Sequence, residues 1–176
     1  MFLAVSTGLF AQKESKEDSK PLSFSIGVDG SLPLGTFGDS YNIGIGGSAQ
    51  ADYKVAESFA ITLNAGYLTY SGKSYQTIVG INPITFQPIY GTAKYAAFNL
   101  IPVLAGAKYW FSPNVYGSAQ LGLSFASGNG NSGSNFTYAP GVGVKFSQFD
   151  VLLKYTGISG NGSSINAAAL RAAFNF

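Results

Sequence analysis

The chain has 176 residues, enough for one domain of moderate size. Ten Lys and Arg residues against eight Asp and Glu residues give a net charge of +2, a bias too weak to indicate a nucleic-acid partner. Only 10% of the residues are charged, against about 25% in an ordinary soluble domain, and the chain contains no Cys and no His. These absences exclude a Ser-His-Asp triad, a Cys-His pair and a histidine-bearing metal site, so we expect neither an enzyme nor a cofactor.

The amino end begins with an apolar run over residues 2–10, which gives way to a polar segment at Ala11 and Gln12. This pattern predicts a secretory signal peptide over residues 1–11. A short apolar tail is the alternative, because no Lys or Arg precedes the run and Leu9 is larger than the residue usual before a cleavage site. Residues 12–21 hold six charged side chains and predict a flexible periplasmic linker.

From Leu22 onward, apolar residues alternate with small or polar ones, which is the period of β-strands with two different faces. We predict eight strands, an even number, each near the roughly 9–11 residues that a tilted membrane strand needs. The predicted strands are Ser23–Leu32, Asn42–Tyr53, Ser58–Tyr70, about Tyr95–Phe111, Val115–Ala126, Phe136–Phe146, Phe149–Ile158 and Ile165–Phe176. The pattern therefore predicts an all-β fold, an eight-stranded antiparallel up-and-down transmembrane β-barrel over residues 22–176.

The connections between these strands alternate in length. Those after the second, fourth and sixth strands are short, at residues 54–57, 112–114 and 147–148. Those after the first, third, fifth and seventh strands are longer and rich in Gly, Ser and Asn. Outer-membrane barrels have short periplasmic turns and longer outer loops, so we predict that both termini are periplasmic.

Alternation alone does not say which face is inside, because a soluble barrel of the lipocalin type is apolar inside and polar outside. Two observations favour the membrane orientation. The polar face consists mostly of small residues, which suits the narrow lumen of eight strands better than a surface in water. Aromatic residues also collect near the strand ends, as interfacial girdles do. They are Tyr53, Phe59, Tyr109, Phe111, Phe146, Phe149, Phe174 and Phe176 at the short-turn end, and Tyr67, Phe125, Tyr138 and Tyr155 toward the other end.

The predicted lumen contains a network of charged side chains. Its members are Asp29, Asp52, Asp150, Lys108, Lys145, Lys154 and Arg171. Charges in a low-dielectric interior must pair or lie in water, so these side chains form either a plug that stiffens the barrel or a narrow ion path. We favour the plug, because side chains can fill an eight-stranded barrel.

The connection after the third strand is the longest, over residues 71–93, and its apolar content is unusual for an exposed loop. It is predicted as a β-hairpin that extends the third and fourth strands, with Asn82 and Pro83 near its turn. Its apolar surface comprises Ile78, Ile81, Ile84, Phe86, Ile89 and Tyr90. This surface is interpreted either as a site for a ligand or partner, or as a strand extension against lipid A and neighbouring loops. Residues 127–135 are predicted as a flexible loop.

Several segments resemble those of a known family. They are residues 101–111, 120–122, 140–146 and the carboxyl-terminal 170–176. Through them the chain resembles the eight-stranded bacterial outer-membrane β-barrel domains, such as the OmpA-, OmpX- and OmpW-like barrels. The resemblance implies a place in the Gram-negative cell envelope, in contact with outer-membrane lipid and lipopolysaccharide. It also implies that Phe174 and Phe176 form the terminal signal recognised by the barrel assembly machinery.

Two functions follow as hypotheses. The first is a structural or partner-binding role through the outer loops of a rigid barrel. The second is a small transport or binding barrel for a small molecule, such as a hydrophobic ligand. A third, less favoured hypothesis is a soluble ligand-binding barrel.

Overall fold

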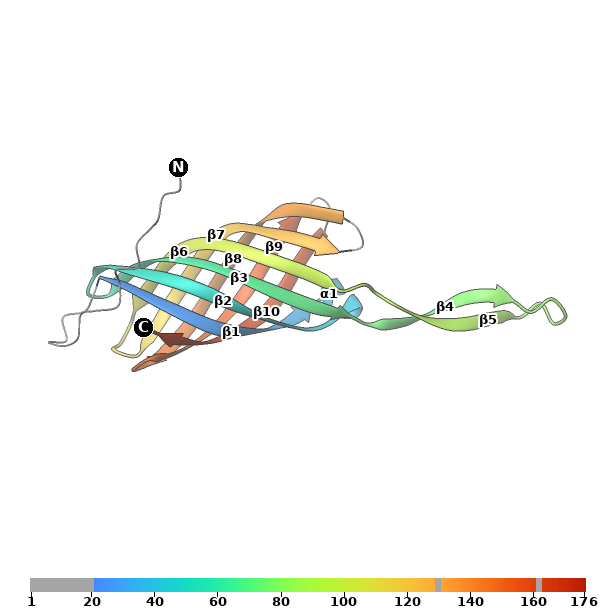
Figure 1. Cartoon of the computed structure of the whole chain (residues 1–176), viewed down its shortest axis with the longest axis horizontal. Coiled ribbons are helices and arrows are strands. Elements are labelled where there is room, and N and C mark those ends of the chain that lie inside the picture. Colours follow the sequence, from blue (N-terminus) through green and yellow to red (C-terminus); the bar gives the residue numbers. More distant parts are fainter. Residues whose placement is uncertain (1–20, 129–130, 161–162) are drawn as a thin grey trace, which may run out of the picture.

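The computed structural model describes residues 21–128, 131–160 and 163–176. The predicted signal peptide and all but the last residue of the predicted linker lie outside the described residues. Eight strands close into one barrel in the order β1-β10-β9-β8-β7-β6-β3-β2, with antiparallel neighbours (Figure 1). Their bounds are β1 Leu22–Leu34, β2 Tyr41–Ala56, β3 Phe59–Gly72, β6 Phe98–Trp110, β7 Val115–Gly128, β8 Asn131–Phe146, β9 Phe149–Gly160 and β10 Ser163–Asn175. The predicted fold class is confirmed.

The alternation of the sequence appears directly as the two faces of the barrel wall. In β1, Ser25 and Asp29 are buried inside the barrel, whereas Phe24 and Val28 point outward and are 53% and 68% exposed. The other strands show the same alternation, so the outward assignment of the apolar face and the inward assignment of the polar face are confirmed. Some large apolar side chains also face inward, among them Leu104 and Leu152. The wall closes because β1 pairs with β10 from Ser25 to Leu34, which leaves neither strand with a free edge in the barrel.

The two ends of the barrel differ. At one end, which we call the turn end, short connections join β2 to β3, β6 to β7 and β8 to β9, and the carboxyl terminus also lies there (Figure 1). The opposite end, which we call the loop end, carries the remaining connections. One of these contains α1, Thr36–Ser40, which the sequence pattern did not predict. No helix in the described ranges is long and apolar enough to cross a bilayer.

A two-stranded hairpin extends from the loop end, between β3 and β6. Its strands are β4, Ser74–Ile81, and β5, Pro88–Lys94, and they form a sheet separate from the barrel. Figure 1 shows the hairpin projecting along the long axis of the barrel, away from the turn end. The predicted hairpin over residues 71–93 therefore exists, with Asn82 and Pro83 in its turn.

The predicted flexible loop over residues 127–135 is wrong for most of its length. β7 and β8 continue pairing through Ser127 with Ser132 and through Gly128 with Asn131. The two strands therefore rise past the neighbouring wall as a ribbon, and residues 129–130 lie outside the described residues. The prediction failed because Ser, Asn and Gly have low strand propensity, whereas pairing with an existing neighbour strand overrides that preference.

Candidate functional site

The lumen is filled by polar side chains that project inward from the wall. Near the turn end, the Lys108 ammonium lies between two carboxylates, 2.8 Å from Asp52 and 3.1 Å from Asp150. The Tyr116 hydroxyl donates a hydrogen bond to the second oxygen of Asp150 at 2.5 Å, and the Lys108 ammonium sits 4.6 Å from the centre of the Tyr116 ring. Strands β2, β6, β7 and β9 are thereby connected across the interior.

Amide side chains continue the network further inside. The Gln120 amide nitrogen donates to Gln50 at 3.1 Å and to Thr62 at 3.3 Å, and the Asn64 amide nitrogen donates to the same Gln50 oxygen at 3.3 Å. Gln50 in turn donates to Asp52 at 2.8 Å, so this layer is joined to the charged group near the turn end. The predicted lumen network included only charged residues and therefore missed these amides. Their positions on the inward face of the strands were the signal that could have identified them.

A second charged group lies farther toward the loop end. The Ser48 hydroxyl donates to Asp29 at 2.6 Å and accepts a hydrogen bond from Arg171 Nε at 2.8 Å. Arg171 Nη2 donates to the Ser25 hydroxyl at 3.0 Å, and the Lys154 ammonium lies 3.8 Å from Asp29. The register that pairs Asp29 with Arg171 brings the first and last strands together at this point.

Apolar side chains close the loop end of the lumen. Phe37 of α1 packs among Leu68, Tyr70, Leu100 and Ile158. The Tyr70 hydroxyl donates to Ser31 at 2.8 Å, which links this cluster to the polar network below it. At the turn end, by contrast, a vestibule of about 890 Å³ reaches inward as far as the Lys108–Asp52 pair.

Six of the seven predicted lumen charges are buried, and the structure brings them into the two groups described above. The exception is Lys145, which is half-buried and lines the vestibule at the turn end. Each of the three buried carboxylates accepts a hydrogen bond from a hydroxyl, an amide or an ammonium group. These bonds connect neighbouring and opposite strands, so the three carboxylates serve to hold the barrel together.

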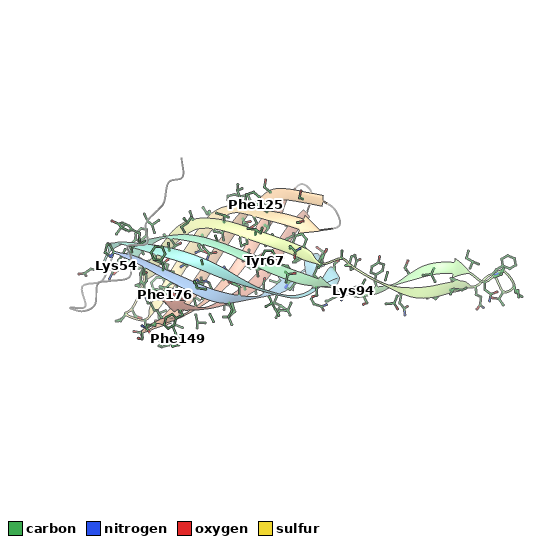
Figure 2. The ribbon with its side chains drawn as sticks, viewed as in Figure 1. Lys54, Tyr67, Lys94, Phe125, Phe149 and Phe176 are labelled. Carbon is green, nitrogen blue, oxygen red and sulfur yellow. The ribbon has the colours of Figure 1, made fainter. Side chains whose placement is uncertain are left out.

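The outside of the barrel is an apolar belt bounded by aromatic side chains. Tyr53, Tyr109, Phe111, Phe149 and Phe176 are exposed at or near the turn end, and several stack edge to face, as Tyr109 does with Phe111 at 5.4 Å between ring centres. Figure 2 shows Phe149 and Phe176 near the turn end, and Tyr67 and Phe125 displaced toward the loop end. The two bands therefore lie where the sequence pattern predicts interfacial girdles.

The hairpin exposes apolar side chains along its whole length. No residue from Ser74 to Ala93 is charged, and Lys94 marks its base in Figure 2. At the turn, Asn82 Oδ1 accepts hydrogen bonds from the N–H groups of Ile84 at 2.9 Å and Thr85 at 3.2 Å. All six side chains of the predicted outer surface are exposed: Ile78, Ile81, Ile84, Phe86, Ile89 and Tyr90. The tip residues Ile84 and Phe86 reach 86% and 80% exposure.

The predicted assembly residues lie at the end of β10. Phe174 pairs with Phe149 on β9, and its ring lies 5.5 Å from that of Phe176. The Phe176 N–H donates to the carbonyl of Phe24 at 2.8 Å, while its side chain points outward. The aromatic pair therefore sits on the outer surface at the turn end.

Comparison with solved structures finds this fold in bacterial outer-membrane barrels. Ail, the attachment invasion locus protein of Yersinia pestis, matches with a TM-score of 0.54 and 17% identity, covering 88% of this chain and 97% of Ail. The N-terminal barrel domain of Pseudomonas aeruginosa OprF matches with a TM-score of 0.53 and 17% identity, covering 88% of this chain and 97% of that domain. Neisserial surface protein A matches with a TM-score of 0.55 and 14% identity, covering 89% of this chain and 96% of that protein. A scan of protein-family models and a search of curated proteins found no match.

These similarities concern the fold. A de novo designed transmembrane β-barrel matches almost as well, with a TM-score of 0.52 and 15% identity over 89% of this chain and 98% of the design. The barrel architecture by itself therefore specifies no cellular task, and a particular function depends on features that the fold carries, such as the lumen and the hairpin.

Proposed function

We propose that this chain, which has the fold of the eight-stranded outer-membrane β-barrels, is an integral outer-membrane protein that presents the β4–β5 hairpin at the cell surface as a contact element. The observation that carries the proposal is the hairpin itself. It holds an uncharged segment with exposed apolar side chains clear of the barrel wall. Exposed apolar surface of this extent is typical of interaction sites, because contact between apolar side chains and water is unfavourable.

The lumen supports a structural barrel more than a transport barrel. From Asp52 to Tyr70 the interior is occupied by hydrogen-bonded side chains, and an apolar cluster covers the loop end. Conduction would require these groups to move apart, at the cost of several buried hydrogen bonds. Transport of a small hydrophobic molecule is therefore the less favoured function.

Other features complete the proposal. The apolar belt would contact outer-membrane lipid and lipopolysaccharide, and both termini would be periplasmic. Residues 1–11 would direct export, residues 12–21 would serve as a linker, and Phe174 and Phe176 would be read by the barrel assembly machinery. Ail has been solved in a phospholipid bilayer nanodisc and with the heparin analogue sucrose octasulfate. The first supports a bilayer environment for a barrel of this shape. The uncharged hairpin gives no reason to propose a polyanionic partner here.

Single-cysteine labelling in intact cells tests the location and orientation. The chain has no cysteine, so Ile84→Cys and Asn114→Cys each introduce one thiol, at the hairpin tip and in the β6–β7 turn. A membrane-impermeant maleimide should label Ile84→Cys in intact cells and Asn114→Cys only after the outer membrane is permeabilised. Labelling of Asn114→Cys alone in intact cells would show the opposite orientation, and recovery of both variants in the soluble fraction would refute a membrane location.

Conductance tests the role of the lumen. The purified full chain in a planar bilayer should give no steady open-channel current, because side chains fill the interior. A steady current that disappears on denaturation would instead support the transport hypothesis.

A further inference from the structure

The seven lumen charges do not cancel evenly along the barrel. Near the turn end there are two carboxylates, Asp52 and Asp150, and two ammonium groups, Lys108 and Lys145. Lys108 bridges both carboxylates, and Lys145 is the cross-strand partner of Asp150. This group is therefore neutral as a whole.

The group farther inside is not neutral. It contains one carboxylate, Asp29, and two cations, Lys154 and Arg171, and all three are buried. The described chain shows no other ion pair to either cation. Asp39 in α1, at the loop end, is not among their partners. With both basic side chains protonated, this group carries one positive charge more than Asp29 balances, and burial makes an unpaired charge unfavourable.

The contacts of this group also leave a donor unused. Arg171 reaches Asp29 only through the Ser48 hydroxyl, and its Nη2 donates to Ser25. Within the described chain, Arg171 Nη1 is buried and has no hydrogen-bond acceptor. Lys154 is held loosely, at 3.8 Å from Asp29, so its ammonium group keeps donors that Asp29 does not occupy.

The wall beside Lys154 is made of small residues, because its cross-strand partners are Gly141 of β8 and Ala169 of β10. Arg171 has a larger neighbour, the inward-facing Leu152 of β9, which is 1% exposed. Lys154 remains 8% exposed, which shows that the group is not sealed completely. A monatomic ion needs little room, whereas a larger organic acid would have to displace the wall.

We infer that Lys154 and Arg171 bind a small inorganic anion of the size of chloride inside the barrel. The anion would accept hydrogen bonds from Arg171 Nη1 and from the Lys154 ammonium, and it would cancel the charge that Asp29 leaves over. The site is a structural one: it stabilises the folded barrel and does not depend on the proposed role of the hairpin.

Unfolding of the full chain in zwitterionic micelles tests the inference. Urea midpoints are compared at equal ionic strength in sodium chloride and in sodium gluconate, whose anion is too bulky for the lumen. Chloride should raise the midpoint in proportion to the logarithm of its concentration, as mass action requires for a ligand that binds only the folded state. Equal midpoints in the two salts would overturn the inference.

Two variants and one direct observation assign the effect to this site. Lys154→Met removes the surplus charge, so it should abolish the chloride dependence while keeping the midpoint in gluconate at or above that of the parent. Lys145→Met, the matched loss of a lysine at the turn end, should keep the chloride dependence. Crystals grown with bromide should show an anomalous peak beside Arg171 and Lys154. A chloride effect that persists in Lys154→Met, or bromide-containing crystals without that peak, would contradict the site.

Discussion

At the scale of single residues, this barrel is stabilised by a few side chains that each connect several strands. Arg171 joins β10 to β1 and β2, and Lys108 joins β6 to β2 and β9. Replacing a whole buried ion pair by apolar side chains often leaves the free energy of unfolding unchanged. Removing one partner alone lowers that free energy strongly, because the remaining charge is left buried and unpaired.

Asp29→Ala tests this asymmetry. The substitution removes the carboxylate that pairs with Lys154 and takes the acceptor from the Ser48 hydroxyl. We expect the free energy of unfolding to fall by about 3–5 kcal/mol. Urea titration in lipid vesicles, followed by the fluorescence of Trp110, the only tryptophan in the chain, measures it. Glu57→Ala, an exposed carboxylate, is the control and should be nearly neutral. A loss as small as that of the control would mean that the Asp29 contacts contribute little.

Gly143 illustrates how the narrow lumen constrains the smallest side chains. It is the cross-strand partner of Tyr116, and a methyl group added at Gly143 would fall on the Tyr116 ring. Gly143→Ala should therefore cost about 1–3 kcal/mol of unfolding free energy, through displacement of the ring and its bond to Asp150. Gly30→Ala provides the comparison, since nothing lies within 4 Å of the added methyl group. That variant should be neutral or slightly stabilising in the same titration. If both variants behave alike, the ring is free to move.

At the scale of strands, the membrane-facing surface is defined by register more than by any one residue. A shift of one residue would exchange the faces of a whole strand, so the burial of Gln120 and the exposure of Leu121 on β7 fix the register of that strand. The depth of each outward residue in the bilayer then sets the loss of unfolding free energy that a charge at that position would cause.

Leu121→Arg is the test of face and depth together. Leu121 points outward and lies midway along β7, so an arginine there should cost about 2–4 kcal/mol of unfolding free energy in lipid vesicles. Val115→Arg, at the turn-end start of the same strand, should cost no more than about 1 kcal/mol. A cost at Leu121 as small as that expected for Val115 would place Leu121 outside the hydrocarbon region.

The hairpin behaves as a separate element, because β4 and β5 pair only with each other. Ser74 and Lys94 are paired at its base, so residues 75–93 can be replaced by a two-residue Asn-Gly turn. We expect the barrel to lose no more than about 1 kcal/mol of unfolding free energy, as for other changes at the surface. A larger loss, measured by urea titration in vesicles, would show that the hairpin supports the barrel rather than serving an outside partner.

At the scale of the whole molecule, the sequence predicts the fold because lipid demands a strict alternation. The outward positions of β1, such as Val28, could be read directly, as could the inward position of Arg171. The partners of the charges could be placed only from the strand order and register. Lys108 on β6 meets Asp52 and Asp150 across the lumen, although β6 pairs with neither β2 nor β9. α1 was missed because five residues give too few periods to recognise, and its packing depends on Phe37 meeting residues from distant strands.

Deletion of the carboxyl-terminal residue, Phe176, distinguishes an effect on the stability of the barrel from an effect on its assembly. In the folded chain, Phe176 contributes one backbone hydrogen bond and an exposed ring, so its deletion should change the unfolding free energy of refolded barrel by only about 1 kcal/mol. If assembly in cells depends on a terminal aromatic signal, the same deletion should lower the amount of inserted barrel several-fold, measured as heat-modifiable protein in outer-membrane fractions. Phe111→Ala removes an equally exposed ring at the same end and should leave the inserted amount unchanged. A selective loss of insertion would point to assembly, because the contacts of Phe176 in the folded state are too few to explain it. Unchanged insertion would show that assembly does not depend on this residue.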